Sequence, residues 1–396
     1  DTTTPDSDQG GRGLPNYLFG VQIAPDGLTA WVPAKKDNIF RGNFIDAQAL
    51  NKDNTVRPLV SVLDLGAGAE SLTRRIDLDD RSLPIHVSFS AQGEFGFVTL
   101  AGSNMVEIRG TDDGVSVATV NDAAMSPRAT LVDAKNHLFV QSALGRNVNV
   151  FDLDPLLSLG DHGTPVQLAD IKTVKIDAVD PQILQGKRIF NSAADSRMAP
   201  QGYLTCAVCH FDGFEDGRVY DFTSRGEGLR NTTSLLGRRG TGQGPVHWSG
   251  NFDEIQDFEQ EIRELFSGHG FIPDDVLSVG TRSQPLGDPK KGLSPELDAL
   301  AAYVTSLDHV DPSPFKNADG SLTADGAAGK ALFGKLGCDF CHSGKDFTDS
   351  ARGRLHDVGT LLPSSGSRSG APLLGIDTPT LLGIWQTAPY LHDGSA

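Results

Sequence analysis

The sequence predicts a multidomain protein whose N-terminal part is all-β and whose C-terminal part is mainly α-helical. Its 396 residues are enough for two or three domains, and 38% of them are apolar, which is enough to bury real cores. Strand–turn–strand patterns recur as far as about Pro165, whereas helical spacing of apolar residues begins after Asp180. We therefore expect three segments, at 1–165, 166–320 and 321–396.

The N-terminal part contains three predicted β-hairpins. In each, a Gly or Asn separates two alternating apolar runs, as in a strand, a tight turn and a second strand. The turn residues are Gly27, Gly93 and Asn136. The hairpins cover residues 23–32, 89–98 and 132–140.

The spacing of these hairpins is typical of β-propeller blades. Gly93 and Asn136 are 43 residues apart, which matches one blade of about 40–45 residues. The longer first interval fits one blade with a polar, loop-like insertion at 35–57. The segment resembles YVTN-type propeller repeats, and a β-sandwich with similar hairpins is the alternative. Because only about three blades fit and a closed propeller needs at least four, we expect the chain to be part of a longer protein, or the missing blades to come from elsewhere.

Helices are predicted in the C-terminal part, after a linker at 166–180. The first begins at Pro181, because proline suits the first turn of a helix and the apolar residues that follow have helical spacing. Two more are expected at 297–307 and 324–336.

All four cysteines lie in two copies of the pattern C-x-x-C-H, which is the attachment signal of c-type haem. Two thiols at this spacing form thioethers to the haem vinyl groups, and the next imidazole becomes the proximal iron ligand. We predict two covalently attached haem c groups, with His210 and His342 bound to iron. Such attachment takes place outside the cytoplasm, so we expect a periplasmic or cell-surface protein. The two motifs consist of Cys206, Cys209 and His210, and of Cys338, Cys341 and His342.

Other uses of these cysteines fit less well. A zinc site would have its two C-x-x-C pairs roughly 15–20 residues apart, whereas Cys206 and Cys338 are 132 residues apart. A dithiol redox pair does not need a following His, and cysteines three residues apart do not readily form a disulfide with each other.

The haem-binding part contains an internal repeat. Residues 231–237 (NTTSLLG) match residues 377–383 (DTPTLLG) at four of seven positions, and each stretch follows a C-x-x-C-H motif. A His lies 16 residues after the start of the first stretch and 15 after the start of the second, at His247 and His392. We expect a duplicated single-haem fold with its two copies packed face to face.

The second copy identifies a related family. Residues 378–395 (TPTLLGIWQTAPYLHDGS) resemble the signature of bacterial di-haem cytochrome c peroxidases, a superfamily that includes MauG, which oxidises a protein substrate. The resemblance covers 181–396. It implies that 166–320 and 321–396 are two cytochrome c domains, the second apparently truncated. It also implies a reactive haem 1 and an electron-transfer haem 2.

The resemblance also assigns roles to individual residues. Trp248 falls where the family has a tryptophan between the haems, from which electrons can pass. A calcium ion between the domains would be held by Asn231, Thr387 and Pro389, and calcium suits carbonyl and amide oxygens. Without the resemblance, we would interpret Trp248 as a core residue and the three calcium candidates as ordinary loop residues.

The sixth ligand of each iron decides between peroxide binding and electron transfer. In many peroxidases of the family that this chain resembles, a His follows the first haem motif by some sixteen residues. No His lies between His210 and His247, so the resemblance implies an open haem 1, with His247 or His269 as the candidates to close it. In the family, the sixth ligand of haem 2 lies beyond the point where this sequence stops. The ligand is therefore either absent or supplied by an earlier residue such as His356, and we expect the sequence to be a segment of a longer protein.

Peroxide cleavage also needs an acid–base group within reach of the iron-bound oxygen. An acidic run at 253–259 follows Trp248 where the resemblance places these groups. Glu259 is the first candidate and Gln256 the second. The alternative is a solvated acidic helix face.

The net charge of −17 argues against binding to nucleic acid or to an anionic membrane surface, and it suits a basic protein partner. No apolar run is long enough for a transmembrane helix. We expect a peroxidase-like oxidoreductase that reduces hydrogen peroxide, or another small oxidant, at haem 1 with electrons delivered via haem 2. Its redox protein partner would be a basic cytochrome or a cupredoxin.

The sequence is also compatible with two other functions. One is a non-catalytic electron-transfer cytochrome with a propeller docking module. The other is an oxidase whose propeller recognises a protein, organic or metal substrate.

Overall fold

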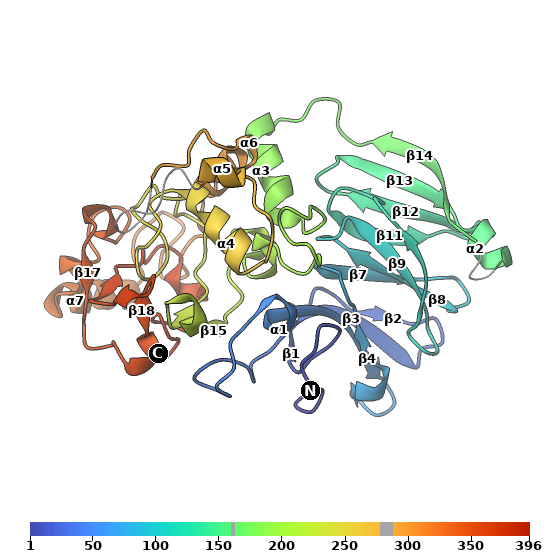
Figure 1. Cartoon of the computed structure of the whole chain (residues 1–396), viewed down its shortest axis with the longest axis horizontal. Helices are drawn as coiled ribbons and strands as arrows, with labels where there is room; N and C mark the ends of the chain where they lie inside the picture. The colour runs from blue at the N-terminus through green and yellow to red at the C-terminus, as the bar shows by residue number, and fades with distance from the viewer. Residues whose placement is uncertain (160–162, 278–287) are drawn as a thin grey trace. The chain divides into compact units, whose positions relative to one another are not determined.

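The computed structural model describes residues 1–159, 163–277 and 288–396 (Figure 1). Every helix among the residues described is too short or too polar to cross a bilayer. The chain divides into two compact units. The first consists of Asp1–Arg41, Asn51–Val208 and Gln260–Phe271, and the second of Gly42–Leu50, Cys209–Glu259 and Ile272–Ala396.

The first unit contains three antiparallel sheets that follow one another along the chain (Figure 1). The first sheet consists of β1 (Leu14–Asn16), β2 (Gln22–Ile23), β3 (Thr29–Asp37), β4 (Val56–Asp64), β5 (Ala69–Glu70) and β6 (Ile76–Asp77), with the short helix α1 (Lys52–Thr55) before β4. The second consists of β7 (Pro84–Phe89), β8 (Phe95–Leu100), β9 (Met105–Gly110) and β10 (Ser116–Val120). The third consists of β11 (Pro127–Val132), β12 (His137–Ser142), β13 (Asn147–Asp152) and β14 (Val166–Lys172), with α2 (Asp154–Leu159) between its last two strands.

The three predicted hairpins are confirmed as β2–β3, β7–β8 and β11–β12. Their turn residues Gly27, Gly93 and Asn136 have φ values of 69°, 85° and 58°. These are left-handed conformations that Gly and Asn adopt more readily than other residues. The second and third sheets are four-stranded meanders in which each strand pairs with the next, as in one propeller blade.

The apolar cores of this unit lie between consecutive sheets. One core joins Trp31 and Val60 of the first sheet to Val98 of the second. The other joins Phe97 of the second sheet to Val140 of the third. Each such buried side chain contributes about 1.5–3 kcal/mol relative to exposure, so the sheets are held together by their facing apolar surfaces.

Two predictions for this unit were wrong in part. The linker expected at 166–180 contains strand β14, which pairs with β13 along its length. The insertion expected at 35–57 is not loop-like at its ends, because Lys35 and Lys36 lie in β3 and are buried. Lys35 forms an ion pair with Asp37 at 3.1 Å, which compensates the burial of both charges.

The three predicted helices are confirmed as α3 (Pro181–Asn191), α6 (Pro295–Thr305) and α7 (Ala324–Lys335). Each begins after a capping side chain, from Asp180, Ser294 and Thr323, that accepts hydrogen bonds from first-turn amides. Two shorter helices are α4 (Glu259–Glu264) and α5 (Asp274–Leu277).

The rest of 181–396 differs from the mainly helical expectation. Most of its described residues lie in loops and single 3₁₀ turns, because Gly, Pro and short polar residues interrupt the apolar spacing every few positions. Three two-stranded antiparallel sheets join these loops. They pair β15 (Val219–Asp221) with β16 (Leu229–Asn231), β17 (Leu355–His356) with β20 (Ile376–Asp377), and β18 (Ser367–Arg368) with β19 (Ala371–Pro372).

Candidate haem-binding sites

The first C-x-x-C-H motif follows α3 and begins with a 3₁₀ turn at Cys206–Val208. The Thr205 hydroxyl donates a hydrogen bond to the Phe190 carbonyl at 2.6 Å, which ties the start of the motif to the end of α3. Cys206 belongs to the first unit, and Cys209 and His210 to the second. Burial raises the pKa of the Cys206 thiol to about 12.

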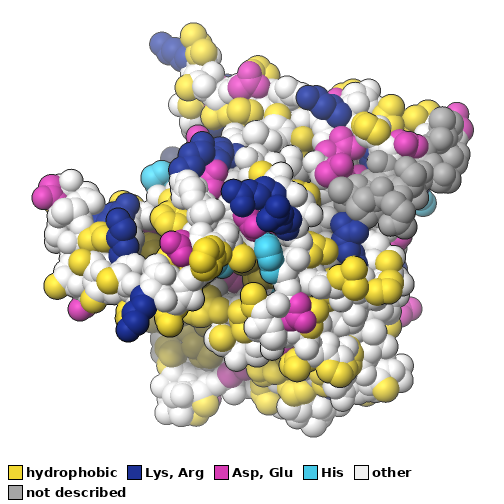
Figure 2. Space-filling view, turned by 90° about the vertical axis from the view of Figure 1, so that its left-hand side faces the viewer, with side chains coloured by type: hydrophobic (Ala, Val, Ile, Leu, Met, Phe, Trp, Pro, Cys, Tyr) yellow, Lys and Arg dark blue, Asp and Glu magenta, His cyan; other side chains and the backbone are white. Residues whose placement is uncertain are grey.

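The second motif has the same order of elements. Helix α7 leads into a 3₁₀ turn at Cys338–Phe340, and His342 follows. No residue of α7 is buried. Around the motif, Leu332, Leu336 and Phe340 are 55%, 73% and 83% exposed. Figure 2, which views the α7 side of Figure 1, shows hydrophobic side chains at this surface beside Lys and Arg.

The two motif histidines are held in the same way. His210 Nδ1 lies 3.3 Å from the Phe214 carbonyl oxygen, and His342 Nδ1 lies 3.0 Å from that of Phe347. A backbone carbonyl on Nδ1 fixes the ring so that Nε2 is the nitrogen that binds a metal.

Haem c fits these donor sets. Each motif supplies two thiols and one oriented imidazole, which is what covalent haem attachment uses. The exposed apolar side chains around the second motif suit a large apolar macrocycle, which would cover them.

A cavity of about 240 Å³ in the second unit lies beside His342. Its wall is mainly apolar and contains several of the predicted site residues. The predicted residues that it brings together are Asn231, Trp248, Cys341, His342, His356, Thr387 and Pro389.

Trp248 is fixed in the wall of this cavity. Its indole Nε1 donates to the Asn231 carbonyl at 2.7 Å. Its ring packs edge-to-face against His392, with 6.4 Å between centroids.

The sequence showed His392 only as part of the repeat, yet the side chain is 1% exposed and its Nε2 lies 2.7 Å from the Ser365 hydroxyl. Burial lowers the pKa of His392, which favours the neutral ring.

The three predicted calcium ligands lie close together. Asn231 Nδ2 donates to the carbonyls of Pro389 at 2.6 Å and Leu391 at 3.3 Å. Among the residues described, the buried Asn231 Oδ1 has no hydrogen-bond partner. Thr387 lies in the same cavity wall. An orphaned amide oxygen beside a carbonyl oxygen fits the oxygen ligands that calcium prefers.

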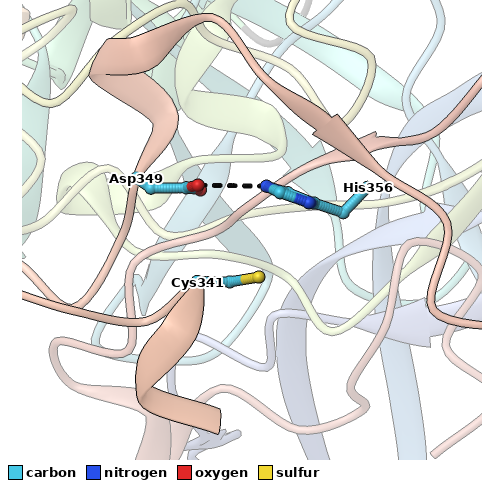
Figure 3. A group of neighbouring side chains, drawn as sticks. All are labelled: Cys341, Asp349 and His356. Atoms are coloured by element: carbon cyan, nitrogen blue, oxygen red, sulfur yellow. Dashed lines mark hydrogen bonds and ion pairs between the residues drawn. The ribbon is translucent and has the colours of Figure 1, made fainter. Parts of the chain in front are cut away.

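His356 lies beside the second motif. Its Nε2 is 3.0 Å from Asp349 Oδ2, and the ligand atoms of Cys341, Asp349 and His356 all lie within 4.8 Å of one another (Figure 3). The cavity therefore has the imidazoles of His356 and His392 in its wall besides that of His342.

The remaining predicted residues do not line this cavity. Glu259 is fully buried and accepts a hydrogen bond from the Ile272 amide at 3.1 Å. Gln256 donates to Asp298 at 2.8 Å. His247 Nδ1 lies 2.8 Å from Asn251 Oδ1, and its ring packs against two phenylalanines. His269 is exposed in the first unit.

Sequence reasoning missed Tyr220, which lies next to the first motif. Its hydroxyl donates to Asp216 at 2.8 Å and is 3.7 Å from the Cys209 sulfur. No motif marks a single Tyr ten residues after a haem-binding His. Only alignment of the two copies through their hairpins reveals it.

Part of the chain is similar to two known proteins. No protein-family model matches the chain. Over 255 residues the chain is 31% identical to hydrazine synthase subunit gamma of Kuenenia stuttgartiensis, covering 53% of this chain and 65% of that one. Over 255 residues it is 26% identical to the methylamine utilization protein MauG of Methylorubrum extorquens, covering 56% of this chain and 67% of that one. The chain thus spans less than two thirds of the first of these relatives, and both similarities support a di-haem cytochrome c peroxidase-like family.

Similar solved structures include the Kuenenia stuttgartiensis hydrazine synthase, with a TM-score of 0.29 and 16% identity over 34% of this chain and 44% of that one. The β-propeller domain of Myceliophteria thermophila Cps50 (Swd1) also has a TM-score of 0.29, with 11% identity over 40% of this chain and 46% of that one. Scores of this size do not by themselves establish a shared fold.

Proposed function

We propose that the chain is an exported di-haem c-type cytochrome that reduces hydrogen peroxide at haem 1 with electrons delivered via haem 2. Haem 1 would be held by Cys206, Cys209 and His210, and haem 2 by Cys338, Cys341 and His342. The segment 1–165 would be the propeller part, followed by cytochrome c domains at 166–320 and 321–396.

The observation that carries this proposal is the cavity beside His342. It joins a haem-binding imidazole to Trp248, whose indole is partly buried in its wall and hydrogen-bonded to the backbone. A fixed aromatic ring next to one redox group can pass electrons toward a second one. Trp248 would have this role.

Bound haem iron supplies the electron chemistry of peroxide reduction, in which one hydrogen peroxide takes up two electrons and two protons to give two waters. The chain must supply the protons. Glu259 is the proposed acid–base group, and Gln256, whose amide does not titrate, would assist by hydrogen bonding; both lie in one segment, at the junction of a 3₁₀ turn (Ile255–Phe258) and α4. Their present bonds to the Ile272 amide and to Asp298 would hold them in position.

A calcium ion would bind at Asn231, Thr387 and Pro389. Asn231 Oδ1, which has no hydrogen-bond partner in the part of the chain that the structure describes, supports this site. The ion would tie the loop that carries the first copy of the repeat to the end of the second copy.

With a net charge of −17, the chain would receive electrons from a basic redox protein, such as a cytochrome or a cupredoxin.

Electron paramagnetic resonance of the protein reduced by one electron, before and after addition of hydrogen peroxide, tests the function. We expect a high-spin ferric signal that disappears with peroxide. A double variant, Cys206→Ala with Cys209→Ala, is the matched control, because it removes haem 1 and should remove that signal while leaving haem 2.

The second candidate function is a non-catalytic electron-transfer cytochrome. It would require both irons to be closed by two strong protein ligands: His356 in the cavity of His342 would close haem 2, and a further residue would have to close haem 1. Low-spin signals alone, unchanged by peroxide, would establish this function and refute the peroxidase.

A further inference from the structure

Tyr220 of the β15–β16 hairpin lies at the edge of the first haem site. Its Oη is 3.7 Å from the sulfur of Cys209, and the side chain is buried, with 5% exposed. In attached haem c this sulfur is bonded to a carbon that comes from a haem vinyl group. The contact therefore places a phenol, which is an oxidisable ring, beside the rim of the macrocycle and not over its iron.

The hydroxyl of Tyr220 is bonded to a buried carboxylate. It donates to Asp216 Oδ2 at 2.8 Å, and the other oxygen of Asp216 accepts from the Arg218 amide at 3.1 Å. Asp216 is 7% exposed. A proton can pass along a hydrogen bond of this length without movement of either side chain.

This carboxylate favours the loss of an electron from Tyr220. A phenol that loses an electron becomes positively charged, and the protein interior stabilises an isolated charge poorly. Transfer of the hydroxyl proton to Asp216 leaves a neutral radical and a neutral acid, so no buried charge is created and one is removed. The Arg218 guanidinium, 5.8 Å from the ring centre, opposes the loss, but it is farther from Tyr220 than the carboxylate is.

The second copy of the repeat has a different ring at this position. Tyr220 pairs with the residue that precedes the stretch 231–237, and His356 pairs with the residue that precedes 377–383. His356 is therefore the counterpart of Tyr220. An imidazole is harder to oxidise than a phenol, so the copy that is proposed to react with peroxide is the one that has the oxidisable ring.

We propose that Tyr220 is a redox-active residue that holds one oxidising equivalent of hydrogen peroxide at haem 1. Tyr220 gives one electron to the haem group that peroxide has oxidised, passes its hydroxyl proton to Asp216, and becomes a neutral radical. Of the two electrons that peroxide takes up, this is one, and the haem iron supplies the other. An electron that arrives from haem 2 restores the phenol, and Asp216 returns the proton. This inference rests on the proposed function.

Electron paramagnetic resonance after rapid freezing tests the inference. The protein with both haems ferric is mixed with hydrogen peroxide and frozen within milliseconds. We expect an organic radical signal in the wild type, and its line shape should change when the tyrosines are ring-deuterated, a result that does not depend on how any variant folds. Tyr220→Phe should lower the signal at least tenfold. Mass spectrometry confirms the two haems, and absorbance follows the reaction of haem 1 with peroxide.

Asp216→Asn tests the role of the carboxylate. The amide keeps the size of the side chain and can accept the hydrogen bond, but it does not take up the proton, so the radical signal should fall about fivefold or more. Asp216→Glu keeps a carboxylate and should restore part of the signal. An unchanged signal in Asp216→Asn would show that the proton does not go to this residue and would overturn the proposed step.

Tyr203→Phe is the matched control. Tyr203 is also buried and its hydroxyl is also bonded to an aspartate, Asp79, but among the residues described its hydroxyl contacts neither pair of haem cysteines. Its replacement should leave the radical signal unchanged. A signal that persists in Tyr220→Phe, or that is lost in Tyr203→Phe, would overturn the inference.

The wild type separates failure of the inference from failure of the proposed function. If haem 1 reacts with peroxide and no tyrosine radical forms, the inference is wrong and the proposed function stands. If both haems are attached and haem 1 does not react with peroxide, the proposed function is refuted and the inference with it.

Discussion

Trp248 couples the two copies of the repeat through its contacts. Its indole N–H bonds to Asn231 of the first copy, and its ring faces His392 of the second. We predict that Trp248→Phe slows electron transfer between the haems by about tenfold, equivalent to about 1.4 kcal/mol in the barrier, because phenylalanine is harder to oxidise. Stopped-flow absorbance after rapid reduction of one haem measures this rate.

The control for this change is Trp385→Phe. Trp385 is 38% exposed and does not line the cavity, so its replacement should leave the rate unchanged. An equal rate in Trp248→Phe and the wild type, with unchanged haem spectra, would exclude Trp248 from the electron path.

Asn231 has the only side chain among the three proposed calcium ligands with an amide oxygen. We predict that a calcium chelator lowers the melting temperature of the wild-type protein by roughly 5–10 °C, which corresponds to about 2.7 kcal/mol of lost binding. Asn231→Ala should melt lower and no longer respond to the chelator. Differential scanning calorimetry measures both effects.

Asn317→Ala serves as the control, because Asn317 is an exposed asparagine of the same unit and should keep the response. A wild-type melting temperature that is the same with calcium and with chelator would rule the site out.

Asp6 is the acceptor of a cluster of basic and amide donors in the first unit. Burial raises the pKa of its carboxyl, but hydrogen bonds from Arg12, Arg41 and Asn38 outweigh burial and lower the pKa to about 2. A lowered pKa stabilises the fold above the unfolded value of 3.8, and this stability is lost as the pH falls toward 2.

We therefore predict that Asp6→Asn costs about 2 kcal/mol of unfolding free energy at pH 7 and weakens the loss of stability between pH 4 and pH 2. Urea unfolding followed by circular dichroism at several pH values measures it. Asp112→Asn, at an exposed aspartate of the same unit, should change neither quantity. An Asp6→Asn curve parallel to that of the wild type at all pH values would contradict the prediction.

At the scale of elements, the turn of the β7–β8 hairpin depends on Gly93. Its φ is 85°, and a Cβ there would lie 3.3 Å from Pro25. We predict that Gly93→Ala costs about 1 kcal/mol, since an L-residue is strained in this region. Urea unfolding measures the cost. Gly20→Ala, at a position with open space and no positive φ, should cost little, and an equal cost at both positions would disprove the turn argument.

Elements with local signals were the ones that the sequence could predict. The hairpins have Gly or Asn at their turns, and α3 and α6 have a capping residue followed by Pro, so a few adjacent residues determine each. Strand β14 has no such signal. It is an edge strand with most of its residues exposed, and its pairing with β13 is what makes it a strand.

The difference between local signals and long-range pairing also explains which residues of the candidate site could be predicted. The haem motifs are runs of five residues and were visible at once. The neighbours of Tyr220 and His392 come from pairing and packing between separate segments, so nothing in the local sequence indicated them. The wrong expectation of a loop at Lys35 and Lys36 has a related cause, because charged residues usually predict exposure and here they are buried in β3.

At the scale of the whole molecule, both units bury apolar side chains, but helix α7 of the second unit does not share in this burial. The first has apolar cores between its sheets. In the second, α7 has no buried residue, and three of its twelve residues are glycines, each costing about 1 kcal/mol relative to alanine. Little of this helix is buried by the polypeptide, so the proposed haem 2 is expected to stabilise it.

We therefore predict that Cys338→Ala with Cys341→Ala abolishes hydrogen-exchange protection in α7, whereas the sheets of the first unit keep theirs. Hydrogen–deuterium exchange with mass spectrometry resolves the two regions in one experiment. The matched variant, Cys206→Ala with Cys209→Ala, removes the other haem and should leave α7 protected. If α7 stays protected without its two cysteines, its stability comes from the polypeptide alone, and the exposed apolar residues around it need another partner.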